Sequence, residues 1–338
     1  MDPVSQGAFG VALSLSYAKK KYFKYALIIG IIAGMAPDLD IFISSDADSL
    51  LALDFHRHFT HSLFFVPIGA FLVACFFWLL FFRKKLKFRY IYLFSFLGYL
   101  THGILDSFTS YGTILFWPIS DYRVTLGYIS IIDPLFTIPL IFAITLSYIK
   151  KSTIIMKWGL IIALSYVAVG SVNYYRVKNY IFNIASERGH KIERYFLNPT
   201  IFNNFAFRTI YQFDGNYYVD AIRLKLFSES IFKQGDMVAV INEDNLFPDI
   251  PSDSILKKDI ERFSYFSKGF IYFPKDNKNI IADLRYGVLP YQINALWGIK
   301  IDIENANKHA KFISLTDKIG ERDYDEFYSF LFPNKKSN

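Results

Sequence analysis

Hydrophobic residues are concentrated in the first half of the chain, where they form long runs separated by short polar connections. Two runs, Leu63–Phe82 and Leu126–Ile149, approach the roughly twenty residues that a helix needs to cross about 30 Å of hydrocarbon. Tyr90–Leu105 and Ile154–Val172 are shorter runs of the same kind and also predict membrane-spanning helices. The pattern therefore predicts a helical membrane region in this half.

Two further runs, Gly7–Ala18 and Tyr25–Ala36, contain only about a dozen residues each. They fit either short tilted spans or a hairpin that dips into the bilayer, and the sequence leaves both arrangements open. Counting them as optional, we expect a membrane α-helical bundle of about four to six transmembrane helices.

From Tyr175 onwards the pattern changes to short apolar stretches separated by turn residues, which is typical of β-strands. Asp214-Gly215-Asn216 lies between two stretches, as in a hairpin loop, and Asp323–Phe332 predicts a terminal helix. The predicted strands are Ala206–Phe213, Tyr217–Phe227, Met237–Val240, Phe270–Phe273, Ile280–Arg285 and Leu296–Ile303. We therefore expect two domains: a membrane-embedded helical domain, residues 1–174, and a small β-rich α+β domain outside the membrane, residues 175–338.

Composition agrees with a membrane protein. The chain is 53% hydrophobic and 20% charged, with a mean hydropathy of +0.24, whereas a soluble domain carries about a quarter charged residues. The net charge of +7 does not indicate nucleic-acid binding, because the basic residues lie in short clusters between apolar runs. The single cysteine, Cys75, excludes an intrachain disulfide and a thiolate metal site. Met1–Ser5 has no basic residue, so we expect no cleavable signal peptide.

The basic residues also predict how the chain crosses the membrane. Twelve of them lie in the connections 19–24, 83–89 and 150–157. The two intervening connections hold one each, Arg57 and Arg123. Under the positive-inside rule the first set faces the cytoplasm. We therefore expect a multi-pass protein of the cell membrane (the inner membrane of a double-membraned bacterium). The intervening connections and, after six crossings, the C-terminal domain would lie on the outer side.

Aspartate and histidine residues gather at the ends of the hydrophobic runs. Pro37-Asp38-Leu39-Asp40 closes the second run, and its proline favours ending the helix there. His56–Ser62 precedes the third run, and Thr101–Asp106 ends the fourth. His102 and Asp106 are four residues apart, so they share one helix face.

Carboxylates and imidazoles without thiolates suit Zn²⁺, Mn²⁺, Fe²⁺ or Ni²⁺, and imidazole argues against Ca²⁺. Each motif alone is common in loops or on helices. However, four of the six histidines border hydrophobic spans, where ionisable groups tend to mark function. A catalytic zinc takes about three protein ligands and a water. Twice that number of candidates predicts two ions, with zinc as the first choice: Asp38, Asp40, His56, His61, His102 and Asp106.

Paired ions suit hydrolysis of a phosphoester, because they lower the pKa of a bridging water and hold both the entering and the leaving oxygen. Arg57 offers a planar fork that matches phosphate, although an arginine snorkelling to the interface would look the same in the sequence. Asp38 and Asp133, the latter within the fifth run, complete the catalytic candidates.

Three motifs, in this order, resemble a known family: Pro37-Asp38-Leu39-Asp40, His56-Arg57-x-x-Thr60-His61-Ser62 and Thr101-His102-Gly103-x-x-Asp106. They are similar to those of the bacterial and archaeal membrane-bound metal-dependent hydrolases, also described as LexA-binding, inner-membrane-associated hydrolases. The resemblance covers residues 1–175 and implies a multi-helix membrane fold with a hydrolase role. The shorter His102–Asp106 pair is also similar to one in zinc-dependent phospholipase C and P1-type nucleases.

The chain departs from this family at two positions. Where the family often has a Thr-His pair, the sequence has Ser5-Gln6, and glutamine is a poor replacement for a metal-binding imidazole. His58 stands where the family commonly has a small residue, so it either replaces the lost ligand or is simply exposed. Gln6, His58, Thr60 and Ser62 are therefore additional candidate site residues. LexA association is not carried over, because no residue here defines it.

These motifs lead to one expected function and two alternatives. We expect a metal-dependent hydrolase that cleaves a phosphoester of a membrane lipid or lipid-linked substrate at the outer interface of the bilayer. A non-catalytic scaffold, whose β-rich domain binds a protein partner, would use the same residues structurally. An ion or proton transporter is less consistent, because the polar residues lie at helix ends and not near the bilayer midplane.

Overall fold

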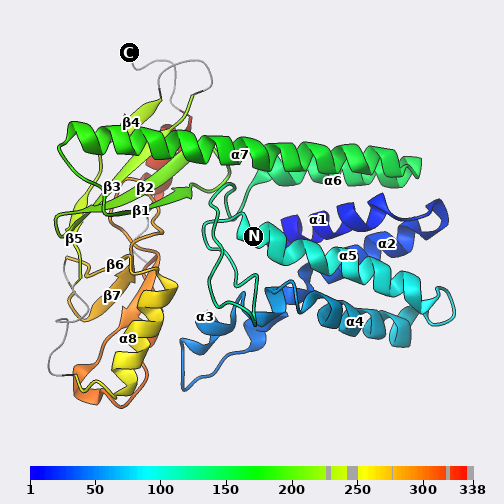
Figure 1. Cartoon of the computed structure of the whole chain (residues 1–338), viewed down its shortest axis with the longest axis horizontal. Coiled ribbons are helices and arrows are strands. Elements are labelled where there is room, and N and C mark those ends of the chain that lie inside the picture. The colour runs from blue at the N-terminus through cyan, green and yellow to red at the C-terminus, as the bar shows by residue number, and fades with distance from the viewer. Residues whose placement is uncertain (226–229, 242–249, 276, 317–319, 333–338) are drawn as a thin grey trace. The chain divides into compact units, whose positions relative to one another are not determined.

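The structure is a computed structural model, and it describes residues 1–225, 230–241, 250–275, 277–316 and 320–332. The chain divides into two compact units, of which the first is mainly helical and the second combines strands with helices (Figure 1). The first unit consists of Met1–Phe42, Phe55–Tyr174 and Ile201–Asn204. The second unit consists of Ile43–Asp54, Tyr175–Thr200 and Phe205–Asn338.

Capping residues set where two helices of the first unit begin. Asp2 and Asp133 accept backbone N–H groups of the first turn of α1 and α6, and a proline follows each of them. The run predicted from Leu126 therefore becomes helical only at Pro134. The main helices of this unit are α1 (Pro3–Ser16), α2 (Phe23–Met35), α4 (Val66–Phe77), α5 (Phe88–Ser107), α6 (Pro134–Lys150) and α7 (Thr153–Glu187), the last of which continues into the second unit.

Glycines allow the helices of the first unit to approach one another closely. A Cβ added to Gly10 of α1 would lie 2.5 Å from the carbonyl oxygen of Gly30 in α2. A Cβ added to Gly103 of α5 would overlap the carbonyl oxygen of His61. Real Cβ atoms do not approach oxygen so closely, so a larger residue at either position would force the backbones apart. The second contact fixes the His61 turn against α5.

Fewer helices than expected have the length and hydropathy of a membrane span. Within the described residues, two pass both criteria: Lys20–Phe42 with 23 residues and Thr153–Glu187 with 35. Leu51–His61 and Val66–Phe82 form a third only if their 89° bend is counted as one broken span. The expected four to six spans (about twenty residues each) were therefore too many. At 17 residues α6 is too short, and tyrosine, threonine, histidine and aspartate lower the hydropathy of α5.

Two antiparallel sheets form the second unit. The five-stranded sheet has the order β1 (Arg194–Pro199), β2 (Ala206–Phe213), β3 (Asn216–Arg223) and β4 (Ile231–Lys233), and β5 (Met237–Ala239) also pairs with β3. The four-stranded sheet has the order β6 (Ile271–Tyr272), β7 (Ile280–Asp283), β8 (Trp297–Lys300) and β9 (Lys311–Ser314). Besides the end of α7, the described part of this unit contains the helices α8 (Ile255–Phe266) and α9 (Glu321–Leu331). Buried aromatic and aliphatic side chains of both sheets share one core that includes Phe196, Ile210, Tyr217, Phe270 and Leu284.

The sequence predictions for this unit are largely confirmed. The range Ala206–Phe213 matches β2 at both ends, and the expected terminal helix is α9. Asp214 and Gly215 adopt left-handed backbone angles (φ 48° and 70°), as a two-residue hairpin loop requires. The strands β1, β4 and β9 and the helix α8 were not predicted. The last two residues of the predicted strand Tyr217–Phe227 lie outside the described residues.

Candidate metal centre

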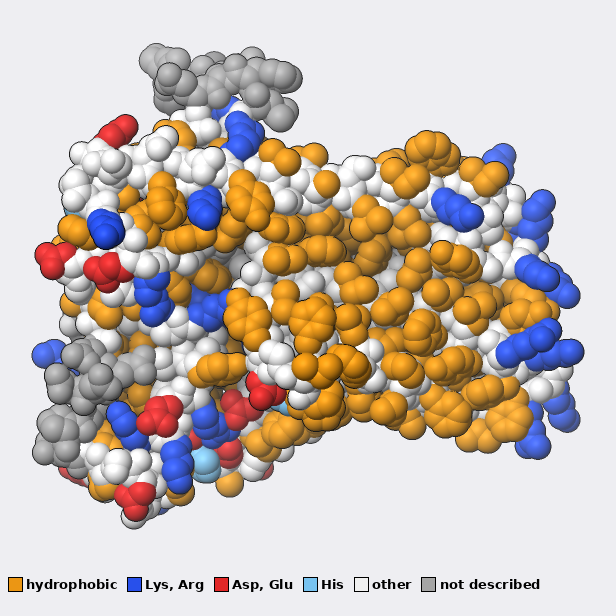
Figure 2. All heavy atoms as spheres, in the orientation of Figure 1, with side chains coloured by type: hydrophobic (Ala, Val, Ile, Leu, Met, Phe, Trp, Pro, Cys, Tyr) orange, Lys and Arg blue, Asp and Glu red, His pale blue; other side chains and the backbone are white. Residues whose placement is uncertain are grey.

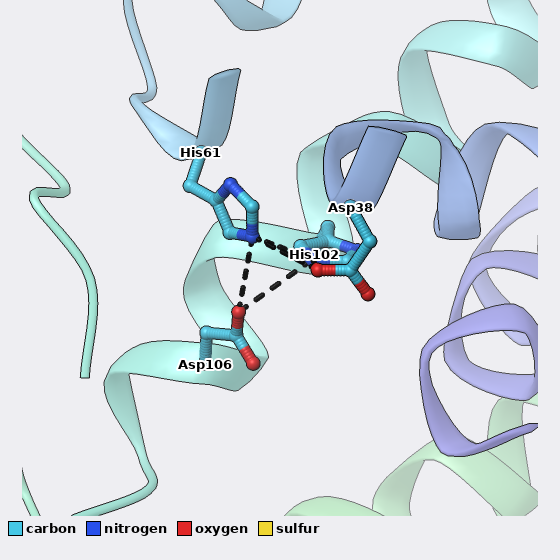
Figure 3. A group of neighbouring side chains, drawn as sticks. All are labelled: Asp38, His61, His102 and Asp106. Carbon is cyan, nitrogen blue, oxygen red and sulfur yellow. Dashed lines mark hydrogen bonds and ion pairs between the residues drawn. The ribbon is translucent and has the colours of Figure 1, made fainter. Parts of the chain in front are cut away.

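Three segments of the first unit bring four potential metal ligands together (Figure 3). Asp38 lies in the 3-10 helix η2 (Ala36–Phe42), which follows α2 directly. His61 ends the 3-10 helix η3 (Phe59–His61), and His102 and Asp106 lie one turn apart on α5. One donor atom of each residue lies within 4.8 Å of the others. The structure therefore joins four of the six ligands expected from the sequence.

The distances between donor atoms are close to those that a single ion imposes. His61 Nε2 lies 3.4 Å from Asp38 Oδ1 and 3.3 Å from Asp106 Oδ2. His102 Nε2 lies 3.3 and 3.5 Å from the same two oxygens. The two Nε2 atoms are 2.9 Å apart. Around a tetrahedral zinc with bonds of about 2.0–2.1 Å, donor atoms lie roughly 3.3 Å apart. The nitrogen–oxygen distances match this value, and the two nitrogens would move apart by about 0.4 Å to hold one ion.

The hydrogen bonds of both imidazoles leave Nε2 as the atom that could bind a metal. His102 Nδ1 lies 2.6 Å from the carbonyl oxygen of Gly34, which can only accept, so Nδ1 carries the proton. His61 Nδ1 lies 3.2 Å from the buried carboxylate of Asp40 and 3.0 Å from the hydroxyl of Thr60. An outer carboxylate or carbonyl that accepts from Nδ1 is the usual partner of a metal-binding histidine. With the proton of each ring on Nδ1, the two Nε2 lone pairs face each other, an arrangement that a bound cation would stabilise.

Asp40 and His56 lie behind the ligands of the first group. Asp40 Oδ1 accepts from His56 Nδ1 at 2.9 Å, and its Oδ2 accepts from the Arg57 N–H at 3.0 Å and the Thr60 hydroxyl at 2.8 Å. Asp38, Asp40 and His56 form another group of donors, which shares Asp38 with the first group. A carboxylate can bridge two ions, so the expectation of two ions stays a prediction. Which nitrogen meets which oxygen could not be known from residue spacing.

Four protein ligands constrain the choice of metal. A tetrahedral zinc bound by all four would be closed, like a structural site, whereas a catalytic zinc keeps a position for water. An ion with six positions, such as Mn²⁺ or Fe²⁺, would keep two of them open. Asp38 is 27% exposed while the other three side chains are fully buried. Solvent or substrate would therefore reach the ion beside Asp38.

Arg57 lies beside the ligands in a strained turn. Its φ of 64° is left-handed, which costs a non-glycine residue about 1–2 kcal/mol. Its N–H donates to Asp40, and its carbonyl accepts from the N–H of Ile114 at 3.1 Å, so the turn is held on both sides. The guanidinium Nε lies 3.2 Å from Asp106 Oδ2, and the group stacks 4.5 Å over the Tyr111 ring. A fixed positive charge thus faces the metal position.

Among the additional candidates, Gln6 and Thr60 lie at the centre. Gln6 is fully buried in α1 and donates its Nε2–H to Asp106 Oδ1 at 2.8 Å, an oxygen that the amino group of Met1 also contacts. The Gln6 side chain therefore holds Asp106 so that Oδ2 faces the histidines. Thr60 acts in the outer layer through Asp40 and His61.

Three other candidates lie elsewhere. Ser62 donates to the carbonyl of Trp117, and the His58 ring packs 6.0 Å from the indole of the same residue. Asp133, expected to be catalytic, instead caps α6 and accepts the Tyr166 hydroxyl at 2.9 Å. Its position just before Pro134, a helix-start signal, could have indicated capping.

The sequence reasoning missed the outer residues of the site. The Gly34 carbonyl orients His102, and Thr109 accepts from Arg57 Nη1 at 3.4 Å. In the sequence, Arg123 served only as a charge for predicting membrane topology. In the structure it is buried, donates to the carbonyl of His56 at 3.3 Å and lies 5.6 Å over the Tyr111 ring. Backbone carbonyls leave no signal in a sequence. A single basic residue in the connection 106–125 is a signal that could have been used.

Comparison with known proteins identifies the first half of the chain. Residues 1–177 match a family described as "YdjM inner membrane protein". The chain is also 28% identical over 179 residues to the uncharacterized protein YfhP of Bacillus subtilis (strain 168). The aligned region covers 52% of this chain and 53% of that protein. The chain therefore spans about half the length of this relative. No solved structure matches the chain.

Proposed function

We propose, from the premise that the chain belongs to the YdjM inner membrane protein family, that it is a membrane-bound, metal-dependent hydrolase of phosphoesters. Its substrate would be a lipid or lipid-linked molecule presented at the outer interface of the bilayer. Membrane residence is supported by the family and by the apolar helices. The reaction and the substrate rest on the arguments that follow.

One observation carries the proposal: the imidazoles of His61 and His102 place their Nε2 atoms 2.9 Å apart, beside carboxylate oxygens of Asp38 and Asp106. If both imidazoles carry their proton on Nδ1, the Nε2 lone pairs repel each other inside a buried pocket, where such repulsion is poorly screened. A proton on one Nε2 would relieve this repulsion. Two carboxylates and two imidazoles are also the donor set of a divalent transition metal, and such an ion would bind all four groups once the two nitrogens move apart by about 0.4 Å.

The residues around the ion divide the chemistry of phosphoester hydrolysis among them. When bound, the ion would lower the pKa of a water and polarise the phosphoryl oxygen. Arg57 would stabilise negative charge on the phosphoryl oxygens as water adds to phosphorus. Asp38, the exposed ligand, has a second oxygen that can accept the proton of that water. The proton would then pass to the oxygen of the leaving alcohol, which completes the cleavage.

Exposed apolar side chains next to Asp38 favour a lipid substrate. Leu39, Ile41 and Phe42, which belong to the same 3-10 helix, are 62%, 61% and 78% exposed. A soluble protein rarely exposes three such neighbours without a binding role. Acyl chains or the bilayer itself would cover them while a headgroup phosphate reaches the ion.

Turnover of phosphate-containing lipids by the purified protein in detergent tests the proposal. We expect release of phosphate or of a phosphorylated headgroup that EDTA abolishes and that added Mn²⁺ or Zn²⁺ restores. His102→Ala should reduce turnover at least 100-fold, since it removes a ligand. His58→Ala is the matched control, because this histidine lies in the same loop but outside the ligand group, and it should retain turnover. Equal turnover in wild type and His102→Ala would contradict the proposal.

One observation favours a second candidate, a scaffold with a structural ion. Four protein ligands are the number found in structural zinc sites. In that case the protein would contain metal, His102→Ala would lower its stability, and no phosphoester would be cleaved. Metal content without turnover on any phospholipid tested would place this candidate first.

A further inference from the structure

A second feature of the helical unit lies at the other end of α5 from the ligands. His102 and Arg89 are thirteen residues apart on this helix, which is about 20 Å along its axis. In Figure 2, lysine and arginine side chains gather at one end of the helical unit, beyond a broad hydrophobic band. These basic side chains have no role in the proposed hydrolase mechanism.

Two turns supply the positive charge. The first runs from the end of α1 into the first turn of α2 and carries four lysines, and the second runs from the end of α4 into the first turn of α5 and carries five basic residues. All nine side chains are exposed, and the sequence has no acidic residue from Pro3 to Pro37 or from Ser62 to Leu105. The positive potential at this end of the unit is therefore not neutralised locally. The nine residues are Lys19, Lys20, Lys21, Lys24, Arg83, Lys84, Lys85, Lys87 and Arg89.

A groove on α5 begins at this charge and continues over apolar residues. An open cavity of about 580 Å³ is lined by Arg89, Tyr90, Tyr92, Leu93 and Phe96. Arg89, Leu93 and Phe96 follow the i, i+4, i+7 spacing of one helix face. The groove thus has one cationic end and an aromatic and aliphatic floor.

Aromatic contacts hold the cationic end in place. The Arg89 guanidinium stacks 4.8 Å over the ring of Tyr90 and donates to its hydroxyl at 3.2 Å. Tyr90 packs 4.7 Å from the Tyr22 ring, and Lys21 lies 4.9 Å over that ring. The two basic turns therefore meet at one point, beside the start of the groove. Tyrosine and cationic side chains in contact are typical of the boundary between hydrocarbon and headgroups.

We propose that this groove binds an anionic glycerophospholipid, with its phosphate on Arg89 and Lys21 and one acyl chain along Leu93 and Phe96. The planar guanidinium matches a phosphodiester, and the surrounding lysines favour a headgroup with net negative charge over a zwitterionic one. The apolar floor requires a chain attached to the phosphate, which distinguishes a lipid from free phosphate. The lipid site is independent of the proposed hydrolase activity.

Native mass spectrometry of the full chain in detergent tests this site. Phosphatidylglycerol and phosphatidylcholine with identical acyl chains are titrated separately, and lipid adducts are counted. Wild type should bind one phosphatidylglycerol at least five-fold more tightly than phosphatidylcholine. Arg89→Gln should lower phosphatidylglycerol affinity about five-fold, the factor expected for one charge near a membrane surface. Lys84→Gln, which removes the same charge from the same turn but does not line the groove, should change it less than two-fold.

Two further measurements distinguish binding of the lipid in the groove from its attraction by the general positive potential of this end of the unit. Leu93→Trp, which fills the apolar floor, should weaken phosphatidylglycerol binding while all charges remain. Glycerol phosphate at millimolar concentration should fail to displace the lipid, since it lacks an acyl chain. Equal losses in Arg89→Gln and Lys84→Gln, or equal affinities for the two lipids, would overturn the site. Displacement by glycerol phosphate would overturn the role of the acyl chain.

Discussion

Among the described residues, each of the two units contains a group of carboxylates and histidines, and the two groups differ in which cations of the protein lie beside them. In the first unit, Asp38, His61, His102 and Asp106 direct donor atoms at a common point. In the second unit, the group Asp48, Asp259 and His309 has donor atoms equally close together. Counting donors alone, both are candidate metal sites.

Arg262 distinguishes the second group from the first. Its guanidinium lies 3.0 Å from Asp48, 2.6 Å from Asp54 and 2.7 Å from Asp259, so it already neutralises this cluster. An ion would have to displace it. In the first unit Arg57 and the Met1 amino group contact Asp106, whereas the groups beside Asp38 are the two imidazoles. A cluster of metal-type residues is therefore informative only once the protein's own cations are counted.

The second group has a structural task. Residues 43–54 belong to the second unit although they connect the Asp40 motif to the His56 motif in the chain. Asp48 and Asp54 bind Arg262, and the Ser49 hydroxyl bonds to the carbonyl of Ala310 at 2.9 Å and the N–H of Phe312 at 2.8 Å. Arg262 thus fixes this connecting segment to the second unit.

The largest expected effect concerns the arginines beside the two groups, Arg57 and Arg262. Arg57→Lys keeps the charge but loses the planar fork, so transition-state stabilisation should fall by about 2–4 kcal/mol. Phosphoesterase kinetics would measure this as a reduced kcat, while metal content stays at the wild-type level. The matched change Arg262→Lys should leave kcat unchanged. A similar loss of kcat in both variants would remove the distinction between the groups.

The next largest effect concerns Asp40, whose carboxylate lies beside Nδ1 of His61. Asp40→Asn keeps the shape but removes the charge that orients Nδ1, so metal affinity should fall about 10–100-fold. Competition with a fluorescent chelator measures this change. The comparison is Asp259→Asn, which removes the corresponding buried charge beside His309 and should leave metal affinity unaffected.

A smaller effect is expected on stability. Arg262→Met leaves three carboxylates without their cation, of which Asp259 is fully buried, so the free energy of unfolding should fall by about 1–3 kcal/mol. Chemical denaturation monitored by fluorescence would show this loss in the second unit. Metal content should not change. If Arg262→Met instead gained a bound ion, the two groups would be more alike than their contacts indicate.

The smallest effect is a pH dependence in the second group. Burial opposes ionisation of Asp48, but the hydrogen bond and charge of Arg262 outweigh it, so the pKa of Asp48 lies below its usual value. Its stabilising contribution is therefore complete above the unfolded-state pKa of about 3.9 and is lost as the pH falls further. Wild type and Asp48→Asn should differ in stability by less than about 1 kcal/mol near pH 7, because solvent screens the pair. The difference should shrink as the pH falls below this value, and a difference that grows on acidification would contradict this assignment.

Sequence reasoning identified the four candidate ligands of the first group, but it did not identify the residues that surround and orient them. Asp38, His61, His102 and Asp106 were found because they end hydrophobic runs, where a buried polar group needs a reason to be present. The outer role of Asp40 and the capping role of Asp133 depend on individual hydrogen bonds, which spacing does not determine.

The fold was predicted unevenly for similar reasons. Strands with clear hairpin signals, such as Ala206–Phe213, were found, while β9 (Lys311–Ser314) has an exposed pattern without strong alternation. Hydropathy overestimated the spans because it does not register where a helix is capped, as at Asp133. It also gave no sign that residues 43–54 belong to the second unit, since that assignment rests on Arg262, more than 200 residues away in the chain.

Metal stoichiometry of the purified full chain, measured by inductively coupled plasma mass spectrometry, tests the central claim most directly. Wild type, a His61→Ala/His102→Ala double variant and His309→Ala would be compared after identical purification, with near-ultraviolet circular dichroism as the check on folding. We predict at least one transition-metal ion per chain in wild type and in His309→Ala, and almost none in the double variant. Folded wild type without metal, or equal loss of metal in His309→Ala and the double variant, would contradict the assignment of the metal site to the first unit.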